Sequence, residues 1–131
     1  MTNYPVLLAG EWREADATGF FQAVDPRTGE PIDGSYPVSS RADLEGAVAA
    51  AADAADALLD TDAGVRAAFL EAYADGIDAH ADEIAERAHI ETALPLSPRL
   101  RDVELPRTTG QLRQAATAVR EGTWMEATID T

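Results

Sequence analysis

The sequence of 131 residues contains no cysteine, and all ten of its basic residues are arginines, so lysine is absent as well. The absence of cysteine excludes disulfide bonds, thiolate zinc sites and a cysteine nucleophile within this chain. The absence of lysine excludes a phosphate-binding Gly-x-x-x-x-Gly-Lys loop. Because no run of about 18 apolar residues and no basic stretch before an apolar one is present, we expect neither a membrane span nor a signal peptide, and a cytoplasmic location.

Acidic residues are the most frequent charged residues in the sequence. The 24 aspartates and glutamates outnumber the 10 arginines and give a formal net charge of −14. A surface of this charge repels phosphate backbones and anionic lipids, so we expect no nucleic-acid and no membrane partner. Thirteen of the acidic residues lie between residues 41 and 91, against three arginines. Alanine is concentrated in the same stretch, which predicts helices with acidic outer faces.

The first forty residues are typical of short strands and turns. Two mostly apolar runs, residues 6–12 and 20–24, flank a polar stretch at 13–19 and predict a β-hairpin. Proline and glycine at 25–30 predict a turn, and residues 31–37 are expected to form an extended loop.

Periodic apolar residues then predict about four helices. Ser40 with Asp43 resembles a capping box and starts a helix that ends near Asp60. The second helix is capped by Thr61 or Asp62, and the third runs from about residue 81 to 92 before two prolines. The last covers about 99–121 and ends at Gly122, and Pro106 is expected to kink or restart it.

The final residues alternate between apolar and polar side chains. Met125, Ala127 and Ile129 would lie on one face of a strand at 124–130. A strand at this place needs a pairing partner from this chain, from a second copy or from further sequence. The fold expected from the residues alone is therefore mostly helical, with an N-terminal β-hairpin, about four helices and a C-terminal strand.

Residue patterns that could support catalysis or metal binding are few. Glu86-x-x-His89 matches one half of a di-iron helix pattern, but it occurs once, and we interpret His89 as an incidental side chain on an acidic helix face. Ser35 lacks the flanking glycines of a nucleophile elbow and is interpreted as a turn serine. No Gly-x-Gly-x-x-Gly is present, so the residues predict no self-sufficient active site.

Several segments form an ordered set along the chain: residues 8–12, 24–30, Asp43 with Ala47 and the alanines that follow, 66–77, 91–95, 99–113 and 120–124. Taken in order, they resemble the N-terminal region of the aldehyde dehydrogenase superfamily, an α/β family, and most closely its 2,5-dioxovalerate (alpha-ketoglutaric semialdehyde) dehydrogenase branch. The resemblance covers essentially the whole chain, and two departures from the pattern are visible. Ala93 replaces a helix-ending glycine, and Pro106 replaces a helix-compatible residue.

The resemblance implies NAD(P)-dependent oxidation of an aldehyde to an acid through a cysteine thioester, with a glutamate activating the hydrolytic water. Both of these residues lie beyond the point equivalent to Thr131 in the family, so no catalytic, cofactor-binding or metal-binding residue is expected in this chain. NAD or NADP is expected for the complete family enzyme and none for this chain alone. Residues 1–123 would belong to the cofactor-binding domain, and residues 124–131 would begin an oligomerisation strand.

The resemblance also suggests two sets of site residues. Arg107 and Gln111 would border the substrate tunnel, where an arginine suits a dicarboxylic semialdehyde such as 2,5-dioxovalerate; an ion pair between Arg107 and Glu104 is the alternative. Met125, Ala127 and Ile129 would form the oligomerisation strand and support a homo-oligomer.

Three hypotheses remain open at this stage. The first is an N-terminal fragment of an aldehyde dehydrogenase that is inactive until it meets the remainder of the enzyme, its expected partner. The second is a stand-alone acidic helical interaction module without enzymatic activity. The third is a metal-binding helical bundle.

Overall fold

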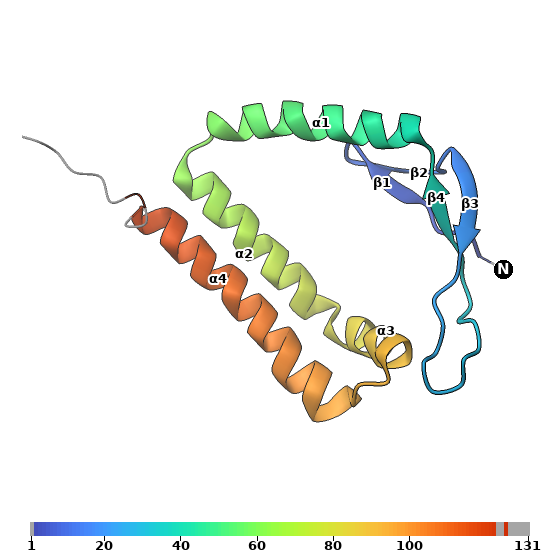
Figure 1. The fold of residues 1–131 in the computed structure, drawn as a ribbon. Helices are drawn as coiled ribbons and strands as arrows, with labels where there is room; N and C mark the ends of the chain where they lie inside the picture. Colours follow the sequence, from blue (N-terminus) through green and yellow to red (C-terminus); the bar gives the residue numbers. More distant parts are fainter. Residues whose placement is uncertain (1, 123–124, 126–131) are drawn as a thin grey trace, which may run out of the picture. The chain divides into compact units, whose positions relative to one another are not determined.

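The computed structural model describes residues 2–122 and 125 and divides the chain into two compact units, residues 1–60 and 61–131. Figure 1 shows short strands and one helix, α1, in the first unit, and helices α2, α3 and α4 in the second. None of the helices among the described residues is both long and apolar enough to cross a membrane. The mostly helical fold with strands near the N-terminus confirms the fold expected from the sequence.

The strands of the first unit form two separate antiparallel pairs. Strand β1 (Val6–Leu8) pairs with β2 (Glu11–Arg13), and β3 (Ala17–Phe21) pairs with β4 (Tyr36–Ser39). Ala9 and Gly10 both have positive φ, 52° and 83°, as a two-residue hairpin turn requires. The single hairpin predicted between residues 6–12 and 20–24 is therefore wrong, because the first apolar run folds back on itself.

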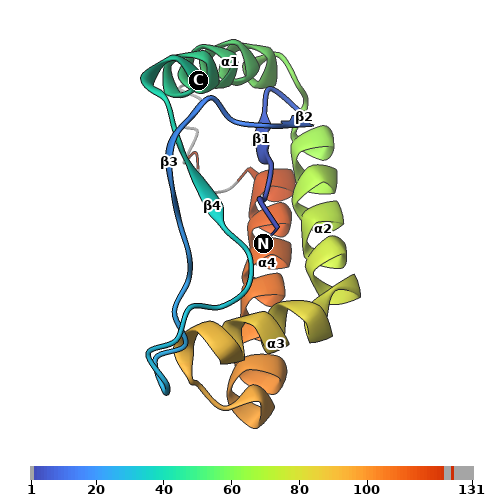
Figure 2. The same ribbon diagram turned by 90° about the vertical axis from the view of Figure 1, so that its right-hand side faces the viewer.

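The partner of β3 is a segment that the sequence did not mark as a strand. Residues 31–37 were expected to be an extended loop, but Tyr36 pairs with Phe21 and Pro37 with Phe20. Proline is rare in strands because it donates no hydrogen bond, and this concealed β4. The intervening turn is as predicted: the amide of Gly29 donates to the carbonyl of Asp25 at 2.8 Å. Figure 2 shows β3 and β4 as two separate segments that are joined by the loop between them.

The helix of the first unit, α1 (Arg41–Leu59), begins at the predicted cap. The Ser40 side chain accepts from the amide of Asp43, and the helix ends at Asp60. The Asp43 carboxylate is buried and turns back toward the strands, where it accepts from Arg13 Nη2 at 2.5 Å and from the amide of Asp16 at 2.8 Å. One carboxylate thus joins the first turn of α1 to β2 and to the residue before β3.

The second unit contains α2 (Ala63–Ala79), α3 (Ala81–Thr92), a π-helical segment η1 (Leu96–Glu104) and α4 (Leu105–Glu121). Asp62 caps α2, and Gly122, with a φ of 64°, ends α4, both as predicted. Ala93 ends α3 at a φ of 60°, so this alanine takes the left-handed conformation that glycine adopts more readily.

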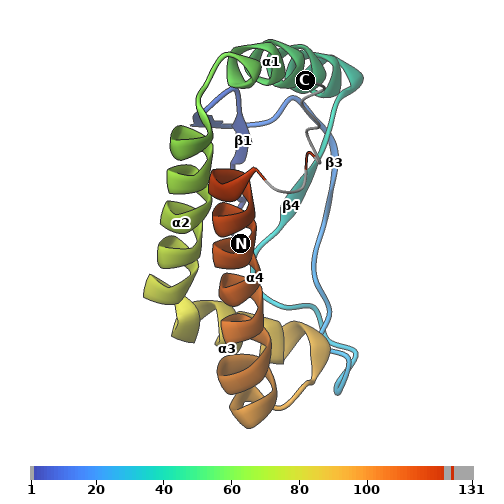
Figure 3. The same ribbon diagram turned by 90° about the vertical axis from the view of Figure 1, so that its left-hand side faces the viewer.

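Pro106 lies in the first turn of α4, where a helix needs no amide donor, which confirms the predicted restart. The expected start at residue 99 was wrong, because η1 precedes α4. Within η1 the amide of Leu100 reaches the carbonyl of Pro95, five residues back. Figures 1 and 3 show α2 and α4 side by side, with α3 crossing their lower ends.

Replacement of Asp43 by alanine tests the link between α1 and the strands. We expect Asp43→Ala to lower the free energy of unfolding by about 1–3 kcal/mol, because it leaves the Asp16 amide and the Arg13 guanidinium without their acceptor. Urea denaturation followed by circular dichroism measures the change. Asp53→Ala, at an exposed position on the same helix, is the matched control and should not lower stability, because alanine favours a helix more than aspartate does. Equal midpoints for the two variants would show that the Asp43 contacts contribute nothing.

Candidate functional site

Small side chains form the contact between α2 and α4. Ala67 and Ala74 of α2 and Ala116 of α4 are fully buried, and Thr109 of α4 is nearly so. Side chains of this size allow two helices to approach closely. Among the described residues no large side chain is fully buried, so this alanine contact is the main core of the second unit.

Arginines of α4 clamp the acidic flank of α2. Arg113 Nη2 donates to Asp75 Oδ1 at 2.6 Å and to Asp78 Oδ2 at 2.8 Å. Arg120 binds Glu71 through both of its terminal nitrogens, at 2.5 and 2.6 Å. Each acidic side chain of α2 thus has an arginine partner on α4.

These contacts shift the pKa values of the groups involved. The hydrogen bond from Arg113 lowers the pKa of Asp78, and the hydrogen bond from Arg120 lowers the pKa of Glu71. The carboxylates in turn raise the pKa of each arginine, mainly through the same hydrogen bonds. All of these groups are solvent-exposed, so water and salt screen the attraction.

The predicted tunnel residues, Arg107 and Gln111, are exposed and lie four positions apart on α4, which places them one turn apart on the same face. Glu104 binds Arg99 at 2.7 Å, so the alternative ion pair between Arg107 and Glu104 is wrong. Within residues 2–122 and 125, Arg107 is the one arginine whose guanidinium meets no carboxylate or carbonyl oxygen. An unpaired arginine is unexpected in a chain with this excess of acid.

The predicted oligomerisation strand lies almost entirely outside the described residues, as do Ala127 and Ile129. Met125 is described: its side chain is exposed, and its amide donates to the carbonyl of Gly122 at 3.1 Å. The strand and the homo-oligomer stay predictions, and so does the assignment of residues 1–123 to a cofactor-binding domain.

The histidines have local partners. His80 Nδ1 lies 3.3 Å from Glu83, and His89 Nδ1 lies 2.5 Å from the carbonyl of Leu94. In the part of the chain that the structure describes, no three histidine, aspartate or glutamate side chains converge as metal ligands would. Ser35 is buried, forms an isolated β-bridge with Asn3 and donates to Asn3 Oδ1 at 2.6 Å. It therefore has a structural role, but the interpretation as a turn residue is wrong.

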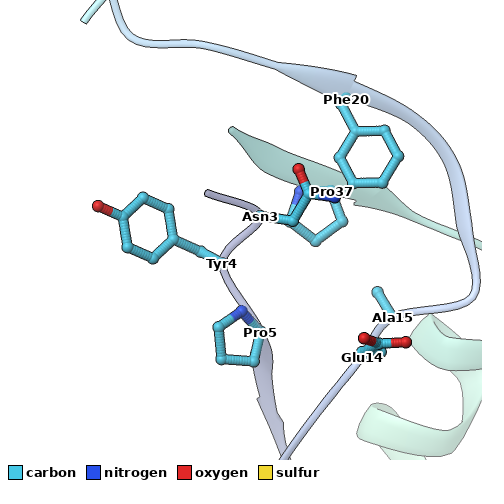
Figure 4. Close-up of a pocket in the computed structure, with 7 residues that line it drawn as sticks. All are labelled: Asn3, Tyr4, Pro5, Glu14, Ala15, Phe20 and Pro37. Carbon is cyan, nitrogen blue, oxygen red and sulfur yellow. The ribbon is translucent and has the colours of Figure 1, made fainter. Parts of the chain in front are cut away.

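The first unit contains a pocket of about 350 Å³ that the sequence did not indicate. Figure 4 shows its lining, in which the hydroxyl of Tyr4 points away from the carboxylate of Glu14. Among the described lining residues Glu14 carries the single carboxylate, and no base or nucleophile faces it. The segments that meet here are far apart in sequence, which is why no local motif could predict the pocket. Its lining residues are Asn3, Tyr4, Pro5, Glu14, Ala15, Phe20 and Pro37.

Solved structures identify the class of fold. An aldehyde dehydrogenase from Bartonella henselae superposes with a TM-score of 0.82 at 20% identity, and the match covers 92% of this chain and 25% of that one. A Mycobacterium tuberculosis aldehyde dehydrogenase, solved in complex with NAD+, superposes with a TM-score of 0.73 at 25% identity and covers 92% and 25% of the two chains.

Sequence comparison leads to the same family. The model of the aldehyde dehydrogenase family matches residues 12–130, so the chain belongs to this family of oxidoreductases. It is 46% identical over 125 residues to alpha-ketoglutaric semialdehyde dehydrogenase 2 of Azospirillum brasilense, a match that covers 95% of this chain and 23% of the relative. The chain thus spans about a quarter of the length of the relatives it matches.

The clamp between α2 and α4 predicts a pH dependence. A carboxylate whose pKa is lowered in the folded state adds stability above its ordinary pKa of about 4, and this stability is lost as the pH falls through the lowered value. We expect the Tm of the wild-type chain to fall below about pH 4, and to fall less in the Arg113→Ala, Arg120→Ala double variant. Thermal unfolding followed by circular dichroism measures both.

Arg41→Ala is the control, because Arg41 forms an exposed pair with Glu45 on α1 and not between helices. Its pH profile should match that of the wild type. Parallel profiles for the wild type and the double variant would contradict the clamp.

Proposed function

We propose that this chain acts as the N-terminal part of an NAD(P)-dependent aldehyde dehydrogenase and does not catalyse the reaction alone. The observation that carries the proposal is the 46% identity to the Azospirillum enzyme over almost the whole of this chain and about a quarter of that one. The reaction of the complete enzyme needs a thiolate, and this chain has no cysteine to supply it. The partner is therefore the polypeptide that corresponds to the other three quarters of the relative.

The cofactor is held by that remaining polypeptide. Bound there, NAD(P) would supply the hydride-accepting chemistry of the reaction. The described residues do not fit a dinucleotide, because its phosphates would meet an acidic surface on which Arg107 is the one unpaired arginine.

The proposed substrate is a dicarboxylic semialdehyde such as 2,5-dioxovalerate. Support comes from the name of the Azospirillum relative and from the unpaired guanidinium of Arg107. An arginine can donate two parallel hydrogen bonds to the carboxylate of the substrate, and the amide of Gln111, one turn further along α4, can donate a third. These two residues would hold the acid end of the substrate and leave its aldehyde end for the catalytic residues of the remaining polypeptide.

Complementation tests the proposed function. The chain is co-expressed with an Azospirillum enzyme from which the matching region has been removed. We expect the two parts to co-purify and to reduce NAD or NADP with 2,5-dioxovalerate, and either part alone to be inactive. A folded chain that neither binds the second part nor restores turnover would contradict the proposal and favour a stand-alone interaction module.

Arg107→Gln tests the substrate assignment in the complemented enzyme. We expect the KM for 2,5-dioxovalerate to rise about tenfold to a hundredfold, because a charged bidentate contact is lost. The KM for an aldehyde without a carboxylate should not change, and Arg41→Gln, at an exposed position on α1, should leave both constants unchanged. An equal rise for both substrates would remove Arg107 from carboxylate recognition.

A further inference from the structure

Helix α2 has two uncharged faces. One face carries Ala67 and Ala74 and packs on α4. The opposite face carries Val65, Phe69 and Tyr73, which are 55%, 68% and 57% exposed. A helix that is apolar on two opposite faces is typical of a position between two layers of structure.

The exposed face forms a continuous surface without acidic groups. Arg66, at one edge of it, is half-buried and donates to the carbonyl of Thr61 at 2.8 Å. Phe69 and Tyr73 stack with ring centroids 6.4 Å apart, and a helical wheel places Ala68, Ala72 and Gly76 among them. The acidic residues of α2 lie on the flank that binds the arginines of α4. Because acid is abundant elsewhere in the chain, a face without it is not typical of a water-facing surface.

A groove of about 790 Å³ between α2 and α3 continues this face. Tyr73, Ile77 and Ile84 are among its apolar lining residues. The charged groups on its rim are paired within α3 and its cap: Arg87 binds Glu91 at 2.5 Å, and His80 lies 3.3 Å from Glu83. The Arg87 and Glu91 charges therefore offset each other at the rim, and the apolar residues are left to contact a molecule that fills the groove.

We infer that this surface, the α2 outer stripe (Val65, Phe69, Tyr73 and the groove beside them), is where an uncharged, apolar segment of the remaining dehydrogenase polypeptide docks. The inference rests on the proposed function. About three quarters of the length of the Azospirillum relative and of the Bartonella structure lies outside the region that this chain covers, so both contain polypeptide that can cover the stripe.

A second copy of this chain fits the stripe less well. Residues 61–131 contain thirteen acidic residues and seven arginines, so two copies would bring like charges together. The repulsion between the acidic surfaces around the stripe would then offset the free energy gained by burial of its apolar side chains.

The test measures how much of the truncated Azospirillum polypeptide co-purifies with a tagged chain. We expect Phe69→Ser and Tyr73→Ser each to reduce the amount retained about tenfold or more, as loss of an aromatic anchor at the centre of an interface does. Gly76→Gln is a second kind of variant. The added Cβ meets no atom within 4 Å in this chain, and glutamine favours a helix more than glycine does, so α2 stays folded while the side chain blocks docking.

Val103→Ser is the matched control, because Val103 is an exposed apolar residue of η1 outside the stripe. It should retain the second polypeptide as well as the wild-type chain does. Circular dichroism of each purified variant checks that the helices are intact.

The possible outcomes separate the inference from the proposed function. If the wild-type parts do not associate, the proposed function fails. If they associate and the α2 variants bind as well as Val103→Ser, the stripe is not the docking surface. If size-exclusion chromatography shows that Phe69→Ser converts a dimer of the isolated chain into a monomer, the occupant is a second copy and the inference is overturned.

Discussion

The close approach of α2 and α4 is the constraint on which the second unit depends. Alanine at the buried positions lets the two helices pack closely, and Arg113 and Arg120 bridge them along one side. This packing fixes which face of each helix is left outside. Arg107 and Gln111 lie on exposed positions of α4, and Phe69 and Tyr73 lie on the outer face of α2.

The use of alanine in the core has a second consequence. Burial of an alanine contributes little hydrophobic free energy in comparison with burial of a leucine or a phenylalanine, so the larger apolar side chains are the main remaining source of stabilisation. In the described part of the chain they lie largely on the surface, with Trp12 70% exposed and Phe69 68% exposed. Monomeric soluble proteins rarely expose large continuous apolar patches. This pattern agrees with a chain that belongs to a larger assembly.

The charged residues also follow a pattern, in which most arginines are paired with acidic side chains of the same chain. Most arginines are used inside the chain to bind acidic side chains, as in the clamp of α4 on α2 and the pair between Arg13 and Asp43. Arg107 stands apart from this pattern, because Glu104, its nearest acidic candidate in sequence, binds Arg99 instead. Among the described residues, Arg107 is thus the one arginine without such a structural contact.

Much of the local structure could be predicted from local physics. The caps at Ser40, Asp62 and Gly122 and the restart at Pro106 each depend on one or two neighbouring side chains, so the helices came out close to the predicted ranges. The pairing of the strands differed from the predicted hairpin. Ala9 at positive φ gave no turn signal, and Pro37 concealed β4, because pairing depends on residues distant in sequence.

The sequence by itself determined the family, the acidity and the positions of the helices, because periodicity, caps and ordered motifs are local properties of the chain. Through the family resemblance it also suggested Arg107 and Gln111 as candidate substrate residues, which stays a prediction. Only the tertiary structure decided that Arg99 takes Glu104 and leaves Arg107 unpaired. Only the structure showed that α2 has a second apolar face turned outward, because which side of a helix is covered depends on the packing of its neighbours.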